Sequence, residues 1–302
     1  MLKGIIPAVI VPMDSSYRVD FDEYKKYMKW IGSTGAKAVA VNVDTGEGPT
    51  LTPQERVEVI RSARSALPEA MIVAGIIGSS TASAVESAKQ AKEAGANAGL
   101  IFPNTAFMGQ PLDPEAPVQY HRELSEKADL DIILFQLQSP LGGIEYSSET
   151  LLKMAGLKKT IAIKEALFDA KKFDDTLRFF KHAAPNISFL TGNDKFIYES
   201  FVLGCDGALI GFGALDAKDL IDSFELVQQG KIKEGLEIRN KFQYLAETIF
   251  APPVRNYRAR TKFALSEIGR LDPKLTYVRS PLLQITEEDK TIVRKALKTA
   301  GL

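Results

Sequence analysis

The chain has 302 residues, of which 45% are hydrophobic, and this is enough material for one large α/β domain with a substantial core. Lysine plus arginine equals aspartate plus glutamate at 38 each, so no basic excess points to nucleic acid or an anionic membrane as a partner. No apolar run approaches the roughly 18 residues of a membrane span, and the N-terminus lacks a signal-peptide layout. We therefore expect a cytoplasmic protein with a small-molecule partner, no membrane contact and no nucleic acid.

Short apolar segments alternate with helical patterns along the first three quarters of the chain. The apolar segments are continuous rather than alternating in polarity, which is typical of a parallel sheet covered on both faces. A helix start is clearest at Thr52, Pro53 and Glu55, which match an N-cap, a proline at the first helical position and an acid in the first turn. Strands are predicted at residues 5–11, 38–43, 71–77, 99–102, 132–137, 160–164, 187–191 and 208–210, and helices at 20–33, 53–66, 82–94, 114–128, 148–155, 170–182, 195–203 and 217–229.

Eight such units predict a (β/α)8 TIM barrel over residues 1–229. An open doubly wound sheet is the competitor, but the segment 11–14 after the first strand is not a glycine-rich dinucleotide turn. Further helices are predicted at 231–250, 256–268 and 287–300, so residues 230–302 form a C-terminal helical extension packed on the barrel. A cluster of basic residues at the second of these helices is interpreted as a solvated face, with the binding of an anionic group as the alternative: Arg255, Arg258, Arg260 and Lys262.

Metal chemistry has little support in the sequence. The single cysteine, Cys205, excludes an internal disulfide, and the two histidines lie far apart. One cysteine and two distant histidines are too few to suggest a zinc site or a Cys–His catalytic pair, so we expect no metal. The abundant Asp and Glu residues leave open a magnesium site made from carboxylates alone.

Lys164 is the strongest catalytic candidate. It ends the apolar run 160–164, and partial desolvation there would lower its pKa towards the neutral amine that attacks carbonyl groups. The alternative is a structural ion pair, for example with Glu165. In a barrel, the loops at the carboxyl ends of the strands converge on one site, which directs attention to the turns after the other strands.

Two of those turns, and two of the strands themselves, carry candidate binding residues. After the second strand, Thr45 and Gly46 offer a hydroxyl and backbone N–H groups to a carboxylate. Phe135 in the fifth strand and Leu209 in the eighth are expected to line the pocket. The glycines at 211 and 213 would let a ligand approach the backbone, and they weakly suggest a phosphate-binding turn.

These residues, taken with their order along the chain, resemble the class I aldolase superfamily of dihydrodipicolinate synthase and N-acetylneuraminate lyase. The matching pieces are Thr45, Gly46 and Glu47, the segment 163–166, Gly192 with Asp194, and the segment 279–282. The resemblance implies that Lys164 forms a Schiff base and that Thr45 with its neighbouring amides holds the carboxylate of a 2-oxo acid. It also implies that the lysine is the only cofactor-like group and that the protein is a homo-oligomer, commonly a tetramer built as a dimer of dimers.

The departures from the family pattern are also informative. Asp44 stands where the family usually has a hydroxyl; its charge would repel a substrate carboxylate, or it could act as a general acid or base. The fifth strand ends with Phe135 and Gln136 in place of the family's proton-transferring tyrosine and the asparagine after it, and segments 139–142 and 103–107 also differ. We therefore predict that the chain is not a true dihydrodipicolinate synthase. Tyr146 is a spare candidate for the missing phenol.

The leading functional prediction is a Schiff-base lyase, an aldolase or a dehydratase, acting on a 2-oxo acid such as pyruvate or a 2-keto-3-deoxy sugar acid. One alternative is a catalytically silent homologue that binds a metabolite. Another is a phosphate-binding barrel isomerase, which would hold phosphate near Gly211 and form no imine at Lys164.

Overall fold

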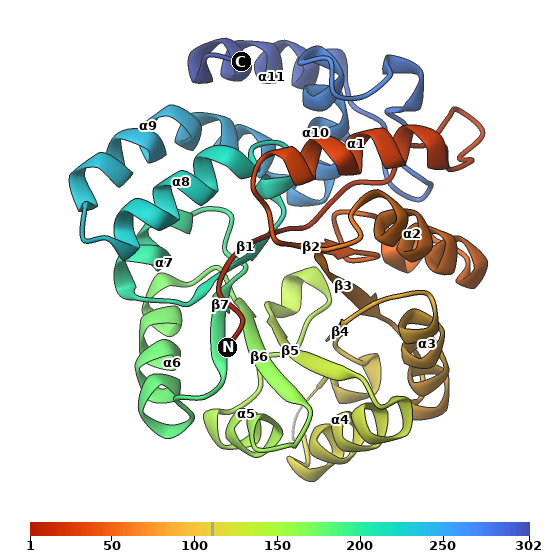
Figure 1. Ribbon diagram of the computed structural model, residues 1–302, viewed down its shortest axis with the longest axis vertical. Helices are drawn as coiled ribbons and strands as arrows, with labels where there is room; N and C mark the ends of the chain where they lie inside the picture. The colour runs from red at the N-terminus through yellow and green to blue at the C-terminus, as the bar shows by residue number, and fades with distance from the viewer. Residues whose placement is uncertain (110–111) are drawn as a thin grey trace.

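Parallel strands form the centre of the molecule, and helices surround them (Figure 1). The computed structural model describes residues 1–109 and 112–302. The strands of the eight-stranded sheet are β1 (Gly4–Pro7), β2 (Ala38–Val41), β3 (Met71–Ile76), β4 (Ala98–Ile101), β5 (Asp131–Leu137), β6 (Thr160–Ala166), β7 (Ser188–Thr191) and β8 (Gly207–Ile210).

The sheet closes on itself. Its order runs from β1 through β8, β7, β6, β5, β4 and β3 to β2. A bridge between Ala8 and Ala40 joins the two ends, and the Val9 N–H donates to the Ala40 carbonyl at 3.0 Å. The (β/α)8 barrel predicted from the sequence is confirmed.

A helix follows each strand, and three further helices extend the chain beyond the barrel. The barrel helices are α1 (Phe21–Ser33), α2 (Pro53–Ala66), α3 (Thr81–Glu93), α4 (Glu115–Ala128), α5 (Ser148–Ala155), α6 (Ala170–Ala183), α7 (Ile197–Leu203) and α8 (Ala217–Gln228). The C-terminal helices are α9 (Ile232–Ile249), α10 (Tyr257–Glu267) and α11 (Glu287–Ala300). Short 3-10 helices lie at Gly48–Thr50, Thr105–Phe107, Ser139–Leu141, Phe212–Ala214, Val254–Asn256 and Pro273–Leu275.

The first strand is shorter than the sequence predicts. The run 5–11 is apolar and buried throughout, but the strand ends at Pro7. Beyond the bridge at Ala8, the chain leaves the sheet, and the Met13 N–H donates to the Leu275 carbonyl at 3.0 Å. The apolar character of this segment therefore reflects burial in the core beyond the last paired residues, and not strand pairing along the whole run.

The strands divide the core into two layers. Alternate residues point inward and fill the barrel, among them Ala40, Val73, Leu100, Ile133 and Leu209. The residues between them point outward and pack against the helices. This two-residue period also sets the direction of functional side chains, because Lys164 shares the inward-facing positions of Ala162 and Ala166.

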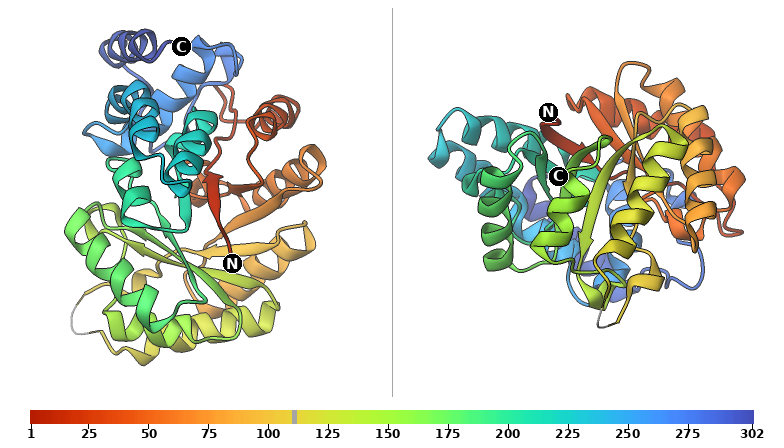
Figure 2. Two further views of the ribbon diagram at one scale, coloured as in Figure 1. Left: turned by 60° about the vertical axis from the view of Figure 1, so that its left-hand side comes forward. Right: turned by 90° about the horizontal axis from the view of Figure 1, so that it is seen from below.

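The C-terminal helices pack on one side of the barrel, near α1 and α8 (Figures 1 and 2). The interpretation of their basic residues as a solvated face is wrong for three of the four. Arg258, Arg260 and Lys262 are 3%, 4% and 0% exposed, and each pairs with a carboxylate. Arg255 alone is exposed, and it donates to the Leu141 carbonyl at 2.8 Å.

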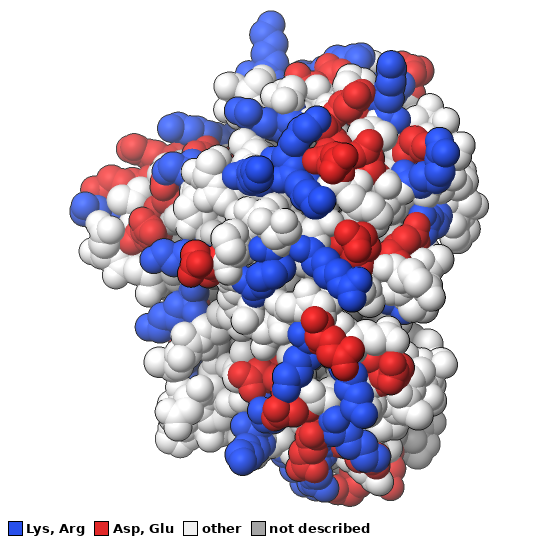
Figure 3. Space-filling view, turned by 45° about the vertical axis from the view of Figure 1, so that its right-hand side comes forward, with Lys and Arg blue, Asp and Glu red and all other residues white. Residues whose placement is uncertain are grey.

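Charged side chains of both signs are interspersed over the face of the molecule shown in Figure 3. This agrees with the equal numbers of acidic and basic residues in the sequence. In the part of the chain that the structure describes, none of the helices has the length and apolar character needed to cross a membrane.

Candidate active site

Lys164 faces a cavity of about 60 Å³ in the barrel. The lining comes from Val43, Asp44 and Thr45 after β2, from β5 and β6, and from the turns after β7 and β8. Phe250, Val254 and Tyr257 complete it from the C-terminal helical part of the chain. The cavity therefore lies at the end of the barrel to which the sequence directs the search for a site.

The surroundings of Lys164 make its neutral form easier to reach than that of a solvated lysine. Burial lowers the pKa of Lys164 to about 8, and the negative charges of Asp194 and Asp44 limit the drop. Its Nζ atom lies 4.3 Å from the centre of the Phe135 ring. Within residues 1–109 and 112–302, Lys164 forms no ion pair and no side-chain hydrogen bond. A lysine held this way is available to attack a carbonyl carbon.

Glu165 is not the partner of Lys164. Its side chain lies on the opposite face of β6, where it is fully buried. The Asn193 amide donates to Glu165 Oε2 at 2.6 Å, and the Leu167 N–H donates to Oε1 at 3.1 Å. The proposed ion pair between Lys164 and Glu165 is therefore wrong, because strand geometry turns neighbouring side chains apart.

The lowered pKa predicts how Lys164 responds to pH. Labelling of Lys164 by an amine-reactive reagent at a series of pH values should reach half its maximal rate near pH 8, because only the neutral amine reacts. Asp194→Asn should move this midpoint lower, because it removes the charge that stabilises the ammonium. Peptide mass spectrometry measures both. A midpoint at 10 or above, as for a solvated lysine, would contradict the burial argument.

Asp194 closes the far side of the cavity, after β7. Its Oδ1 atom accepts a hydrogen bond from the Phe212 N–H at 2.8 Å, in the turn after β8. Burial raises the pKa of Asp194 to about 7, opposed by this hydrogen bond and by Lys164. A phosphate beside Gly211 would meet this carboxylate and find the Phe212 N–H already used. The phosphate-binding interpretation of the turn thus loses its physical basis.

Gly192 is needed for the close approach of β7 to Lys164. A Cβ atom at this position would lie 2.5 Å from Lys164 Cε and 3.0 Å from the Ala166 Cβ. Any larger residue would displace the lysine side chain, so the absence of a side chain here fixes its path into the cavity.

Tyr257 is the site residue that sequence analysis missed. It begins α10, and its hydroxyl donates to Asp44 Oδ2 at 3.1 Å and lies 3.3 Å from Thr45 Oγ1. Its ring stacks on Phe250 with ring centres 4.7 Å apart. Burial, and then the charge of Asp44, raises the pKa of Tyr257 well above its usual value, so the phenol stays protonated. The cavity therefore does contain a phenol, supplied from outside the barrel.

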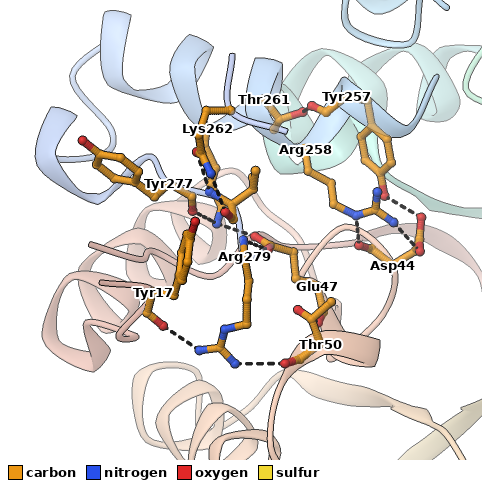
Figure 4. A network of polar contacts seen from close by, with 12 residues as sticks. Tyr17, Asp44, Glu47, Thr50, Tyr257, Arg258, Thr261, Lys262, Tyr277 and Arg279 are labelled. Atoms are coloured by element: carbon orange, nitrogen blue, oxygen red, sulfur yellow. Dashed lines mark hydrogen bonds and ion pairs between the residues drawn. The ribbon is translucent and has the colours of Figure 1, made fainter. Parts of the chain in front are cut away.

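Arg258 neutralises Asp44. The buried guanidinium forms an ion pair with the Asp44 carboxylate, and its Nε atom donates to the Asp44 carbonyl at 2.6 Å (Figure 4). The sequence predicts that a charged Asp44 would repel a substrate carboxylate. Because the Arg258 guanidinium is paired with Asp44, its positive charge offsets the negative charge that would repel the substrate.

The remaining predicted residues divide into two groups. Thr45 and Phe135 line the cavity with Lys164 and Asp44. Gly46 and Leu209 are not among its lining residues: Gly46 packs against the Val9 carbonyl, which would lie 2.8 Å from a Cβ, and Leu209 fills the barrel interior.

Tyr146 is buried beside a separate surface hollow formed after β4 and β5. Its backbone N–H donates to the Gln136 side chain at 3.0 Å. Its position outside the lining of the Lys164 cavity removes the argument for it as the spare phenol. Over the described ranges, no group of three or more His, Cys, Asp or Glu side chains is arranged to hold a metal ion.

Comparison with known proteins agrees with this geometry. The model of the dihydrodipicolinate synthetase family matches residues 1–300. The 4-hydroxy-tetrahydrodipicolinate synthase of Thermotoga petrophila is 26% identical, and the alignment covers 100% of this chain and 100% of the relative. The enzyme of the same name from Chlorobium phaeovibrioides is 29% identical, and the alignment covers 100% of this chain and 98% of the relative. The structure of chloride-inhibited dihydrodipicolinate synthase from Acinetobacter baumannii with pyruvate is 25% identical, with a TM-score of 0.87 over 100% of this chain and 99% of that one. The chain belongs to the dihydrodipicolinate synthetase family.

Proposed function

We propose that the protein is a Schiff-base lyase whose Lys164 condenses with the keto carbon of a 2-oxo acid. The observation that carries this proposal is the partly buried amine, which forms no ion pair in the described structure and lies in a cavity at the carboxyl ends of the barrel strands. The iminium then acts as an electron sink for cleaving or forming a carbon bond or for eliminating water. No separate cofactor is required, because the lysine itself supplies the electrophilic centre.

Pyruvate or a 2-keto-3-deoxy sugar acid is the proposed substrate class. The Acinetobacter relative was solved with pyruvate, and Thr45 lines the same cavity as Lys164 here. The turn after β2 is held from two sides, by Arg258 at Asp44 and by Lys262 at Glu47. A fixed turn of this kind suits the binding of a carboxylate in one orientation. A homo-oligomer and a cytoplasmic location remain sequence-based proposals.

The prediction that the chain is not a true dihydrodipicolinate synthase gains no support from the comparisons, because the curated relatives carry that activity in their names. Its main ground was the missing phenol at Phe135. Since Tyr257 supplies a phenol to the same cavity, synthase activity belongs among the reactions to be tested.

A product assay distinguishes the remaining functions. The protein is incubated with 2-keto-3-deoxy sugar acids, and pyruvate release or water elimination is followed by NMR; a parallel reaction tests for 4-hydroxy-tetrahydrodipicolinate. Pyruvate release would identify an aldolase, and a dehydrated 2-oxo product would identify a dehydratase. Formation of 4-hydroxy-tetrahydrodipicolinate would identify a synthase. An imine at Lys164 without turnover in any reaction would overturn the lyase proposal and favour the silent binding protein.

A further inference from the structure

We propose that Tyr257 carries the proton transfers that form the imine at Lys164. This inference rests on the proposed function, because it concerns the same condensation. It assigns a catalytic role to a helix outside the barrel, at a position that no strand-end pattern would identify.

Imine formation needs a group that moves protons from nitrogen to oxygen. When a lysine ammonium condenses with a ketone, a carbon–nitrogen bond forms, the carbon–oxygen bond breaks and water leaves. The three ammonium protons are then divided: one stays on the iminium nitrogen, and two leave with the oxygen. Each transfer can be made by a hydroxyl that gives its own proton to the oxygen and regains one from the nitrogen. The charge and the atoms balance with no other reactant.

The cavity offers few groups for this task. Asp44 is paired with the Arg258 guanidinium, and Asp194 lies on the far side of the cavity, with one oxygen on the Phe212 N–H. Tyr257, by contrast, lies beside Thr45, the residue proposed to contact the substrate carboxylate. Thr45 has an aliphatic hydroxyl, which is a much weaker acid than a phenol. Among the described residues that line the cavity, Tyr257 is the only phenol. Burial keeps this phenol protonated, so it starts with a proton that it can give to the departing oxygen.

The surroundings of Tyr257 hold its hydroxyl in one place. Stacking on Phe250 fixes the ring, and Thr45 lies beside the hydroxyl. The hydroxyl donates to Asp44, a contact drawn in Figure 4. Thr45 is also the residue proposed to contact the substrate carboxylate, so the phenol lies next to the bound acid. A positioned proton carrier of this kind typically contributes about 10²-fold to 10⁴-fold in rate.

The test is the rate of imine formation. Pyruvate is added, the reaction is quenched with borohydride at increasing times, and the adduct is quantified by intact-mass spectrometry. Tyr257→Phe keeps the stacked ring and removes only the hydroxyl. We expect it to form the adduct about 10²-fold more slowly than the unaltered protein, while the amount formed at long times stays similar. Tyr27→Phe is the matched control, because Tyr27 is also buried and donates its hydroxyl, to the Ala214 carbonyl at 2.8 Å, without lining the cavity. It should react at the unaltered rate.

A rescue variant separates proton transfer from a structural effect. Phe135→Tyr in the Tyr257→Phe protein returns a phenol to the cavity beside Lys164 Nζ, and part of the lost rate should return. Equal rates for Tyr257→Phe and the unaltered protein would overturn the role of Tyr257 and leave the lyase proposal intact. Absence of any adduct in the unaltered protein would instead overturn the lyase proposal. If Tyr257→Phe does not fold, replacement of tyrosine by the more acidic 3-fluorotyrosine must change the rate; an unchanged rate overturns the role.

Discussion

Replacing Lys164 by methionine is expected to abolish the borohydride-stable adduct with every 2-oxo acid and to reduce turnover by roughly 10⁴-fold or more. Methionine has a similar length and no amine, so the cavity is kept while the nucleophile is lost. Removing a buried ammonium also removes its desolvation cost, so the melting temperature should be unchanged or higher. Intact-mass spectrometry after borohydride, with a melting curve for each variant, measures both effects.

Lys195→Met provides the matched control for this prediction. Lys195 follows Asp194 directly but is exposed to solvent. Its replacement should leave adduct formation and turnover unchanged. An adduct that persists in Lys164→Met, or that disappears in Lys195→Met, would mean that the nucleophile has been misassigned.

Replacing Lys262 by methionine is expected to lower the free energy of unfolding by about 3–5 kcal/mol. Lys262 is fully buried, and its Nζ atom lies 2.5 Å from Glu47 Oε1 and 2.7 Å from the Tyr277 carbonyl (Figure 4). Without the ammonium, the one hydrogen bond left to the buried Glu47 carboxylate among the described residues comes from the Arg279 N–H, which donates to its Oε2 at 2.7 Å. Urea denaturation followed by circular dichroism measures the loss.

A double variant tests whether this cost comes from an uncompensated charge. Glu47→Gln combined with Lys262→Met removes both charges, so it should lose less stability than the sum of the two single changes. Additive losses would indicate that the two side chains act independently. Because Glu47 lies two residues after Thr45, Lys262→Met alone should also loosen the turn that is proposed to bind the substrate carboxylate.

The barrel could be predicted because its strands are buried on both faces and therefore appear as uninterrupted apolar runs. Lys164 could be predicted for the same reason, since a lysine that ends such a run cannot be fully solvated. The extent of β1 could not, because a run that stays buried in the core beyond its last paired residue looks the same as a strand.

The C-terminal helix α10 shows where sequence patterns fail. Its basic residues look like a solvated face, but residues 257–265 are all buried, so the helix has no solvated face along most of its length. Its charges are instead satisfied by carboxylates far away in the sequence, such as Asp44 and Glu47.

The contact of Tyr257 with Asp44 joins residues 213 positions apart. No periodicity or local motif encodes such a pairing, and only the folded chain reveals it. The pocket residues Gly46 and Leu209 were predicted from their position near strand ends. Neither residue lines the cavity, because Gly46 packs against the Val9 carbonyl and Leu209 fills the barrel interior. Their positions along the chain do not reveal this packing.

Borohydride trapping followed by peptide mapping tests the central claim most directly. The protein is mixed with pyruvate or a longer 2-oxo acid, and any imine is reduced with borohydride. The intact mass is then measured before the protein is digested for peptide mapping. We expect one adduct per chain, located on Lys164, and the acid that traps best identifies the substrate class. A folded protein that gains no mass from any acid, or gains it on exposed lysines alone, would contradict the assignment of Lys164 as a Schiff-base nucleophile.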